Sequence, residues 1–446
     1  MHRNVQETVT TLFNRLRTSP FAAHVAHLGT GTLAAHLVTL AASPILSRLY
    51  TPEEFGLFSL FHSLCVLLSF LATGTYEYAI VLPRDEQPAR QLVRLTTFTS
   101  ALFSSLLFFG LMGFAPWLSE LFDLHTHFLM LLPLGVFTHA CLNISTNWLI
   151  RQTSFKTMSL AKMGQALSMG GVQIGFGAAG LSATGLSATS WTSIGMLAGY
   201  IAGRIAFVTG AFGKKRSELR ELLSGWNRGE LIQVATLYKD HPRYVLLSSL
   251  LSAAAIELPV LLITSLFGNE ELGHYGLAFR VLMAPVTLIG TSVGHVFFQK
   301  FARRKSDGLP LAQFLLQIWG ILALIAILPF GALFLFGQPV FSFVFGAEWS
   351  LSGIVASVMA PMLFFTFLTQ PTGKSMLVLE KQRWMPLFSV LSLVLRLAAL
   401  ITGALYFDFI TALWLMVGGQ ILSYLIHSGF LFAWAKQFDE AQTPNA

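Results

Sequence analysis

Twelve apolar stretches of about 20 residues, separated by short polar segments, run along the 446-residue chain. A helix of that length crosses the hydrocarbon core of a bilayer, whereas a spanning strand needs only about ten alternating residues. The pattern therefore predicts an all-α polytopic membrane protein with about 12 transmembrane helices. They are expected at 27–47, 55–79, 95–118, 128–150, 157–179, 185–209, 245–267, 275–298, 312–337, 351–373, 385–406 and 410–434.

Composition supports the membrane class. Hydrophobic residues make up 54% of the chain and charged residues 11%, against about 25% charged residues in ordinary globular proteins. A soluble enzyme, a disordered chain and a secreted disulfide scaffold are all excluded by this balance. Both cysteines, Cys65 and Cys141, lie in apolar stretches, so they indicate neither a disulfide framework nor a metal site.

The positive charges are distributed unevenly. Of the 28 Lys and Arg residues, 24 lie at the N-terminus or in segments assigned to loops after even-numbered stretches, including Arg151, Lys156 and Lys162; Arg48 alone lies in an opposite loop. Cytoplasmic loops of membrane proteins carry this excess, so both termini are expected to be cytoplasmic. The net charge of +7 is then a topology signal, and a nucleic-acid partner is not expected.

An internal repeat predicts two lobes. LYTPEEFGLFSL from Leu49 and LFGNEELGHYGL from Leu266 align at an offset of 217 residues, with Gly56 matching Gly273. The same offset places the third stretch on the ninth and the fifth on the eleventh. Six helices per copy give a parallel pseudo-repeat, an arrangement in which two lobes rock around a central substrate path. The expected division is a lobe at 1–210, with an interfacial helix at about 3–17, a solvated basic connector at 211–244 and a lobe at 245–446.

Ionisable residues inside apolar stretches are costly and therefore informative. Arg396 and Glu257 are central in their stretches, and Glu257 closely precedes Pro259, which lacks a backbone N–H. Two interpretations stay open for Arg396: a structural pair with Glu257, or a cationic site that faces a cleft. Arg280 has the same alternatives. Arg204 and Glu77 lie near predicted cytoplasmic ends, where a structural role is favoured.

A cationic path in an apolar protein suits an anionic substrate, because arginine binds phosphate oxygens in bidentate fashion. The sequence contains no motif for nucleotide binding, zinc hydrolysis or thiol redox chemistry. We therefore expect no enzyme activity, no cofactor and no metal. A charged group that couples transport to an ion gradient is the remaining role for a central carboxylate. Glu257 and Glu77 are the candidates.

The segment GTGTLAAHLVTLAASPILSRLYTPEEFGLFSL, followed by YEYAIVLPRDEQPA, resembles the N-terminal signature of bacterial polysaccharide-biosynthesis flippases. These are the Wzx-like members of the multidrug/oligosaccharidyl-lipid/polysaccharide exporter (MOP) superfamily. LGHYGLAFRVLMAPVTLIGTSVGHVFFQKFAR, FGAEWSLSGIVASVMAPM and LEKQRW resemble later parts of the family pattern. The resemblance covers nearly the whole chain. The Gly-xxx-Asp-Arg signature of the major-facilitator superfamily is missing from the corresponding loop, LPRDEQPARQLVR.

The resemblance implies a multi-pass transporter of the cell inner membrane. Such a protein flips undecaprenyl-pyrophosphate-linked oligosaccharide units for O-antigen, capsule or exopolysaccharide synthesis. Its implied partners are that substrate, membrane lipids, and a polysaccharide polymerase and chain-length regulator. The family's cationic cavity maps onto Arg280 and Arg396, with Arg48 and Arg204 as weaker candidates. A drug or small-solute exporter on the same fold and a membrane-embedded glycan-assembly enzyme remain as alternatives.

Overall fold

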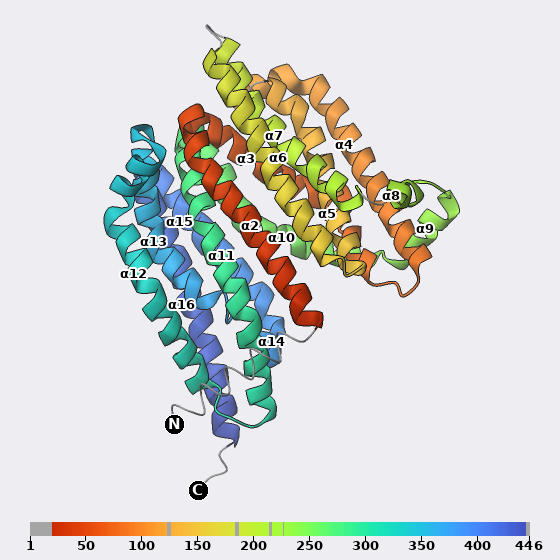
Figure 1. The fold of residues 1–446 in the computed structure, drawn as a ribbon. Coiled ribbons are helices and arrows are strands. Elements are labelled where there is room, and N and C mark those ends of the chain that lie inside the picture. Colours follow the sequence, from red (N-terminus) through yellow and green to blue (C-terminus); the bar gives the residue numbers. More distant parts are fainter. Residues whose placement is uncertain (1–19, 123–125, 183–186, 214–215, 226, 443–446) are drawn as a thin grey trace. The chain divides into compact units, whose positions relative to one another are not determined.

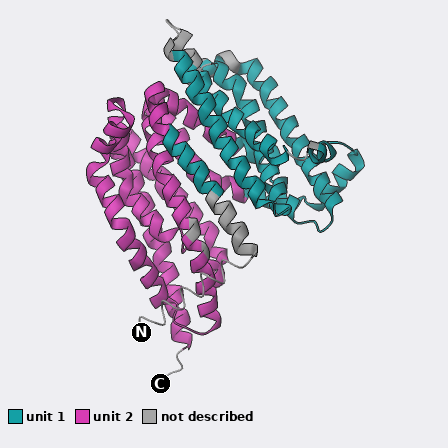
Figure 2. Cartoon of the chain, in the orientation of Figure 1, with its two compact units in different colours: residues 1–42, 68–247 teal, residues 43–67, 248–446 magenta. Residues whose placement is uncertain are grey.

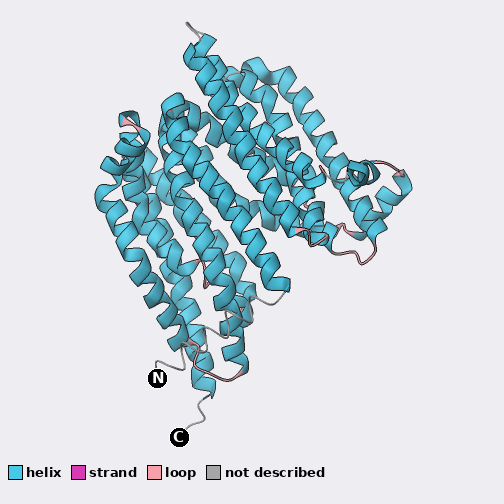
Figure 3. Cartoon of the chain, in the orientation of Figure 1, coloured by secondary structure: helices cyan, strands magenta, loops and turns pink. Residues whose placement is uncertain are grey.

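The computed structural model describes residues 20–122, 126–182, 187–213, 216–225 and 227–442 of the chain, and the regular structure of these residues is helical (Figures 1 and 3). The predicted interfacial helix at about 3–17 lies outside them. The described helices of 20 residues or more are α2 (Pro20–Leu49), α3 (Pro52–Thr73), α4 (Glu86–Phe122), α5 (Thr126–Arg151), α6 (Phe155–Ser182), α7 (Ser187–Phe212), α10 (Leu246–Phe267), α11 (Asn269–Ser306), α12 (Ala312–Phe345), α13 (Ser350–Thr369), α15 (Met385–Tyr406) and α16 (Phe409–Gln442).

Each predicted apolar stretch falls on one of these long helices. Within the described residues, 11 helices are long and apolar enough to cross a membrane. The long helix outside this group is α6, whose Gly, Ser, Gln and Lys residues lower its hydropathy. The all-α polytopic class is thereby confirmed, while the count of 12 and the cytoplasmic location of the termini stay predictions.

The second predicted stretch is too long. It was expected to reach residue 79, but α3 ends at Thr73. Gly74 and Thr75 both have φ near +58°, in the left-handed region that stops a right-handed helix. The chain continues as the short 3₁₀ helix η1 (Tyr76–Val81). Glu77 therefore lies in η1 and not inside a membrane helix, which corrects its predicted location.

The chain forms two compact units (Figure 2). The first unit comprises residues 1–42 and 68–247, and the second comprises residues 43–67 and 248–446. Most of the first repeat lies in the first unit. Its segment 43–67, however, groups with the second repeat.

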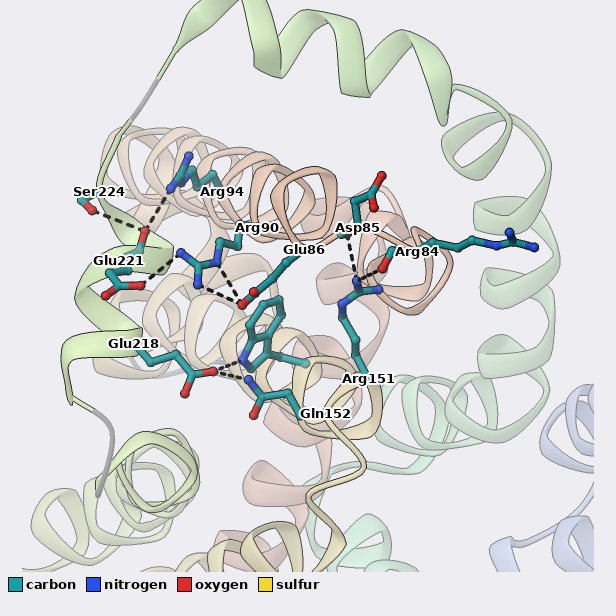
Figure 4. Close-up of polar contacts among 11 residues, drawn as sticks. Arg84, Asp85, Glu86, Arg90, Arg94, Arg151, Gln152, Glu218, Glu221 and Ser224 are labelled. Carbon is teal, nitrogen blue, oxygen red and sulfur yellow. Dashed lines mark hydrogen bonds and ion pairs between the residues drawn. The ribbon is translucent and has the colours of Figure 1, made fainter.

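In the first unit, the connector segment is folded onto α4. It forms α8 (Arg216–Leu223) and α9 (Arg228–Leu237), which both pack against that helix. Arg94 of α4 donates hydrogen bonds to the carbonyls of Glu221, Leu222 and Gly225, at 2.9–3.0 Å. These are carbonyls that a helix end leaves without partners. The connector is thus a docked helical pair in its described part, and Arg94 stabilises the end of α8 (Figure 4).

Arg151 organises the loop that carries the LPRDE part of the family-like signature. Its guanidinium donates to the carbonyls of Ile80 and Pro83, and to those of Arg84 and Asp85 at 3.2 and 2.9 Å (Figure 4). In the same region, Glu218 of α8 accepts hydrogen bonds from Trp148 and Gln152. Arg151 and Arg94, which the sequence assigned to topology alone, therefore also hold a loop and the end of α8 in place by bonds to the backbone.

In the second unit, residues 43–67 dock through polar contacts at helix ends. The short helix η3 (Ala347–Trp349) places Trp349 so that its indole N–H donates to the Ser47 carbonyl at 2.8 Å. The Ser47 hydroxyl donates to the Phe345 carbonyl at 2.9 Å. Phe55 packs edge-on against Trp349, with ring centroids 4.8 Å apart. Buried backbone groups at these helix ends thereby find partners.

The two repeat copies meet at their shared glycine. A Cβ on Gly56 would lie 1.8 Å from the Asn269 carbonyl oxygen, and a Cβ on Gly273 would lie 1.7 Å from the Pro52 carbonyl oxygen. Gly56 and Gly273 are equivalent at the offset of 217, and so are Pro52 and Asn269. The contact between α3 and α11 is therefore locally symmetric, and at its centre only glycine leaves room for the facing backbone.

We expect Gly56→Ala or Gly273→Ala to destabilise the protein by about 1–3 kcal/mol, since the added methyl overpacks a backbone contact. Thermal unfolding of the purified protein in detergent measures the effect. Gly110→Ala on α4 is the matched control, because its Cβ meets open space. Equal melting temperatures for all three variants would show that the α3–α11 contact is not as close as described.

Candidate functional site

Three of the predicted site residues lie on the helices of the second unit. Arg396 is on α15, Glu257 on α10 and Arg280 on α11. Arg48 lies near the end of α2, also in the second unit. Arg204 and Glu77 belong to the first unit. The candidate site is therefore built from α3, α10, α11 and α15 within the second unit, and each of its charges has a specific partner.

Arg396 joins three helices. Its side chain comes from α15, and the residue is 8% exposed. One terminal nitrogen donates to the Ala255 carbonyl of α10 at 2.9 Å. The other donates to the Tyr275 hydroxyl of α11 at 3.2 Å. The Arg396 guanidinium is buried and donates to acceptors on two other helices. Its positive charge is therefore held in a fixed position.

Pro259 explains why the Ala255 carbonyl is available. In a helix this carbonyl would accept from the N–H of the residue four positions later, which is Pro259. Proline has no N–H, so the carbonyl loses its usual donor inside an apolar helix. An unsatisfied backbone group in such a place costs several kcal/mol. Arg396 supplies the missing donor, which gives it a structural role in addition to its charge.

Glu257 lies two residues from this carbonyl, on the same helix. Its Oε2 accepts a hydrogen bond from the Ser63 hydroxyl of α3 at 2.5 Å. The Arg396 guanidinium also attracts the Glu257 carboxylate electrostatically. The structure thus brings the predicted pair to one site and gives each member a separate hydrogen-bonding partner. Ser63 comes from the first repeat and Glu257 from the second, so their bond crosses between the repeats.

Arg280 lies on α11, five residues after Tyr275. Its guanidinium carbon is 5.6 Å from the centre of the Phe58 ring on α3, within range of a cation–π interaction. The rings of Tyr275 and Phe279 stack at 5.7 Å beside it. Arg280 is therefore part of α11, and Arg396 contacts the same helix through Tyr275. Their charge and fork-shaped donors suit a phosphate or pyrophosphate group.

The weaker candidates have partners of their own. Arg48 is exposed and donates to the Pro44 carbonyl of its own helix at 2.6 Å. Arg204 lies in the first unit, 3.7 Å from the centre of the Tyr200 ring. Tyr200 is in turn 2.7 Å from Nδ1 of His139 through its hydroxyl. The favoured structural role of Arg204 is consistent with this packing.

Glu77 is a buried carboxyl group of the first unit. It is 1% exposed. Burial raises the pKa of Glu77 to about 7, because an apolar environment disfavours the ionised form. The protonated form of this carboxyl group is therefore favoured more than that of an exposed glutamate.

Sequence reasoning missed Ser63 and Tyr275. Each is one of several polar side chains in its apolar stretch, and both are buried. The only available signal was their spacing within the repeat, which does not specify a partner on another helix. Within the described residues, no group of three or more His, Cys, Asp or Glu side chains could hold a metal ion.

Solved structures of other proteins have the same fold. The lipid II flippase MurJ in an inward-closed conformation is similar with a TM-score of 0.70 and 11% identity, over 93% of this chain and 90% of that one. An inward-facing multidrug resistance MATE family transporter of the MOP superfamily is similar with a TM-score of 0.60 and 14% identity, over 93% and 98%. These likenesses define the class: a polytopic membrane protein with the fold of MOP-superfamily transporters.

The family follows from the sequence match. A family model described as polysaccharide biosynthesis protein matches residues 45–207 and 240–354, and the chain belongs to that family. The teichuronic acid biosynthesis protein TuaB of Bacillus subtilis (strain 168) is 26% identical over 192 residues, which is 41% of this chain and 40% of TuaB. The matched part thus spans less than half of that relative. The resemblance to the polysaccharide-biosynthesis flippases is confirmed.

We expect Arg396→Met to destabilise the protein by about 2–4 kcal/mol, since it leaves the Ala255 carbonyl buried without a donor. In a Pro259→Ala background, residue 259 regains an N–H for that carbonyl, and the same substitution should cost at least about 1 kcal/mol less. Thermal unfolding of the four proteins of this double-mutant cycle is the measurement. Additive effects would contradict the capping role of Arg396.

We expect Glu77 to make stability depend on pH. Its pKa in the folded protein is raised to about 7 from 4.5, so the fold favours the protonated form, and stability falls as pH rises from about 4.5 to about 7. Glu77→Gln should therefore be more stable than the wild type at pH 8, by up to about 3 kcal/mol, and similar to it near pH 4.5. Melting temperatures across this pH range test the prediction; parallel curves would refute it.

Proposed function

We propose that this protein translocates undecaprenyl-pyrophosphate-linked oligosaccharide units across the bacterial inner membrane by alternating access. The observation that carries the proposal is the match of a polysaccharide biosynthesis family to both halves of a chain with a MOP-superfamily fold. TuaB is named for teichuronic acid biosynthesis and MurJ as a lipid II flippase, and both names support a substrate that combines a lipid and a glycan. O-antigen, capsule and exopolysaccharide assembly are the proposed destinations.

The cations of the second unit give this substrate a binding site. Moving a charged phosphate from water into a low-dielectric medium costs on the order of 20 kcal/mol, so the headgroup needs compensating charge inside the protein. Arg280 is half-buried, and its guanidinium carbon lies 5.6 Å from the centre of the Phe58 ring. We assign it the main contact to pyrophosphate. Arg396, which is already bonded to Ala255 and Tyr275, adds its charge from a fixed position.

Glu257 is the proposed coupling residue. A group can drive transport only when its affinity for an ion or proton differs between conformations. Its carboxylate is bonded to Ser63 of α3, so a conformational change that moves α3 away from α10 would remove this partner. Protonation or binding of sodium would compete with the attraction that Arg396 exerts on Glu257. Glu77 is the second candidate and lies in the first unit.

A drug or small-solute exporter is the second candidate function. The observation in its favour is the similarity to a MATE family multidrug transporter. An exporter of cationic drugs would not need Arg280, whereas a flippase of anionic lipids would. The two functions are therefore separated by the charge of the substrate that the protein moves.

We expect purified protein in liposomes to move a fluorescent undecaprenyl-pyrophosphate-linked sugar between leaflets, and Arg280→Gln to slow this at least about tenfold, the loss expected for a charged hydrogen bond. Arg303→Gln is the matched control on the same helix, with an 84% exposed side chain. Movement of a cationic drug but not of the lipid would favour the exporter. A covalent glycan product in detergent would identify a membrane-embedded enzyme instead.

The same liposomes test the coupling role. Glu257→Gln should abolish the dependence of transport on a pH or sodium gradient, because the amide keeps the shape of the side chain but binds neither ion. The exposed Glu270→Gln is its control. Unchanged gradient dependence in Glu257→Gln would remove Glu257 from the mechanism.

A further inference from the structure

Lys162 lies inside a helix and not in the loop to which the sequence assigned it. It is the eighth residue of α6 (Phe155–Ser182), about 10 Å along the helix axis from the first residue. Its side chain is half-buried. An ammonium group in such a position is costly unless it gains a partner, and charged residues in these positions mark ligand or ion sites.

The side chain of Lys162 reaches a neighbouring helix. Its Nζ donates to the Thr32 hydroxyl of α2 at 3.1 Å. A lysine that snorkels extends along its own helix to the lipid headgroups, whereas Lys162 points across to α2. The two helices are close here, because a Cβ on Gly31 would lie 2.2 Å from the Cβ of Ser159. Close packing one turn before Lys162 holds the ammonium in a defined place.

No negative charge balances this ammonium in the described part of the first unit. Thr32 is neutral, and His36 lies one turn further along α2. Four carboxylates of the described first unit bond to other groups: Glu86 and Glu221 pair with Arg90, Glu218 accepts from Trp148, and Glu230 accepts from Gln91. A cation held between two helices with a neutral partner is suited to binding an anion.

We propose that Lys162 and Thr32 form an anion-binding site of the first unit that takes a phosphate or pyrophosphate group. The choice of this anion rests on the proposed function. The ammonium has three donors and gives one to Thr32, so two are left for phosphate oxygens. Phosphate from a lipid headgroup and free inorganic phosphate share this chemistry. Both residues belong to the first unit.

The test measures binding to the full-length protein in nanodiscs of phosphatidylcholine. The probes are inorganic pyrophosphate and undecaprenyl pyrophosphate, with undecaprenol as the uncharged control. We expect Lys162→Gln to weaken binding of the pyrophosphate probes about 10- to 100-fold, the usual loss for a charged hydrogen bond, and Lys162→Arg to retain most of it. Lys156→Gln is the matched control, because Lys156 is exposed on the same helix, and it should stay within about twofold of the wild type.

Thermal unfolding gives a second readout. Lys162→Met removes an unbalanced buried charge and should raise the melting temperature without anion. Pyrophosphate should stabilise the wild type more than this variant, in which the proposed second-unit cations remain. Much tighter binding of the lipid than of inorganic pyrophosphate identifies the headgroup as the ligand, and equal binding identifies the free anion.

Three results would overturn the site: unchanged affinity in Lys162→Gln, an equal loss in Lys156→Gln, or no binding of either pyrophosphate probe to the wild type. The binding test and the transport test can fail separately. A protein that binds pyrophosphate through Lys162 but moves no lipid would refute the flippase and keep the site. A working flippase with unchanged affinity in Lys162→Gln would do the opposite.

Discussion

A backbone carbonyl inside an apolar helix must find a donor, and the Ala255 carbonyl has lost its own to Pro259. Arg396 provides that donor from α15, and its second terminal nitrogen binds Tyr275 on α11. One requirement of the backbone thereby links three helices of the second unit. It also places a buried positive charge near Glu257, whose carboxylate is bonded to Ser63 on α3. The structural and functional interpretations of Arg396 are therefore compatible, because the bonds that fix the guanidinium also fix its charge.

The contact between the repeats depends on a second backbone constraint. Gly56 and Gly273 allow the first turns of α3 and α11 to approach until each faces the carbonyl of the other helix. A residue with a side chain would separate these helices and displace Phe58 from Arg280 and Ser63 from Glu257. The identity of the two glycines at the repeat offset thus has a packing explanation. It also accounts for the grouping of residues 43–67 with the second repeat.

The positive charges of the chain serve different purposes that only their partners distinguish. Arg94 and Arg151 satisfy backbone carbonyls at the ends of helices and in a loop of the first unit. Arg280 contacts an aromatic ring and has a charge that suits a substrate. Lys162 contacts a hydroxyl and has no described counter-ion. In sequence, Arg94, Arg151 and Lys162 all belong to the same positive-inside pattern.

Apolar stretches and local similarity were enough to predict the helical class, the positions of the long helices, the repeat and the family. These follow from the length of apolar stretches and from local similarity, both of which are properties of neighbouring residues. The sequence also identified Arg396, Glu257 and Arg280, since a charge in an apolar stretch is visible without a structure. The tertiary structure decided what these charges contact: Ala255, Tyr275, Ser63 and Phe58 lie on other helices, up to 194 residues away in the case of Ser63 and Glu257. It also corrected the predicted locations of Glu77 and Lys162. A left-handed turn and the direction of one side chain cannot be recognised from hydropathy.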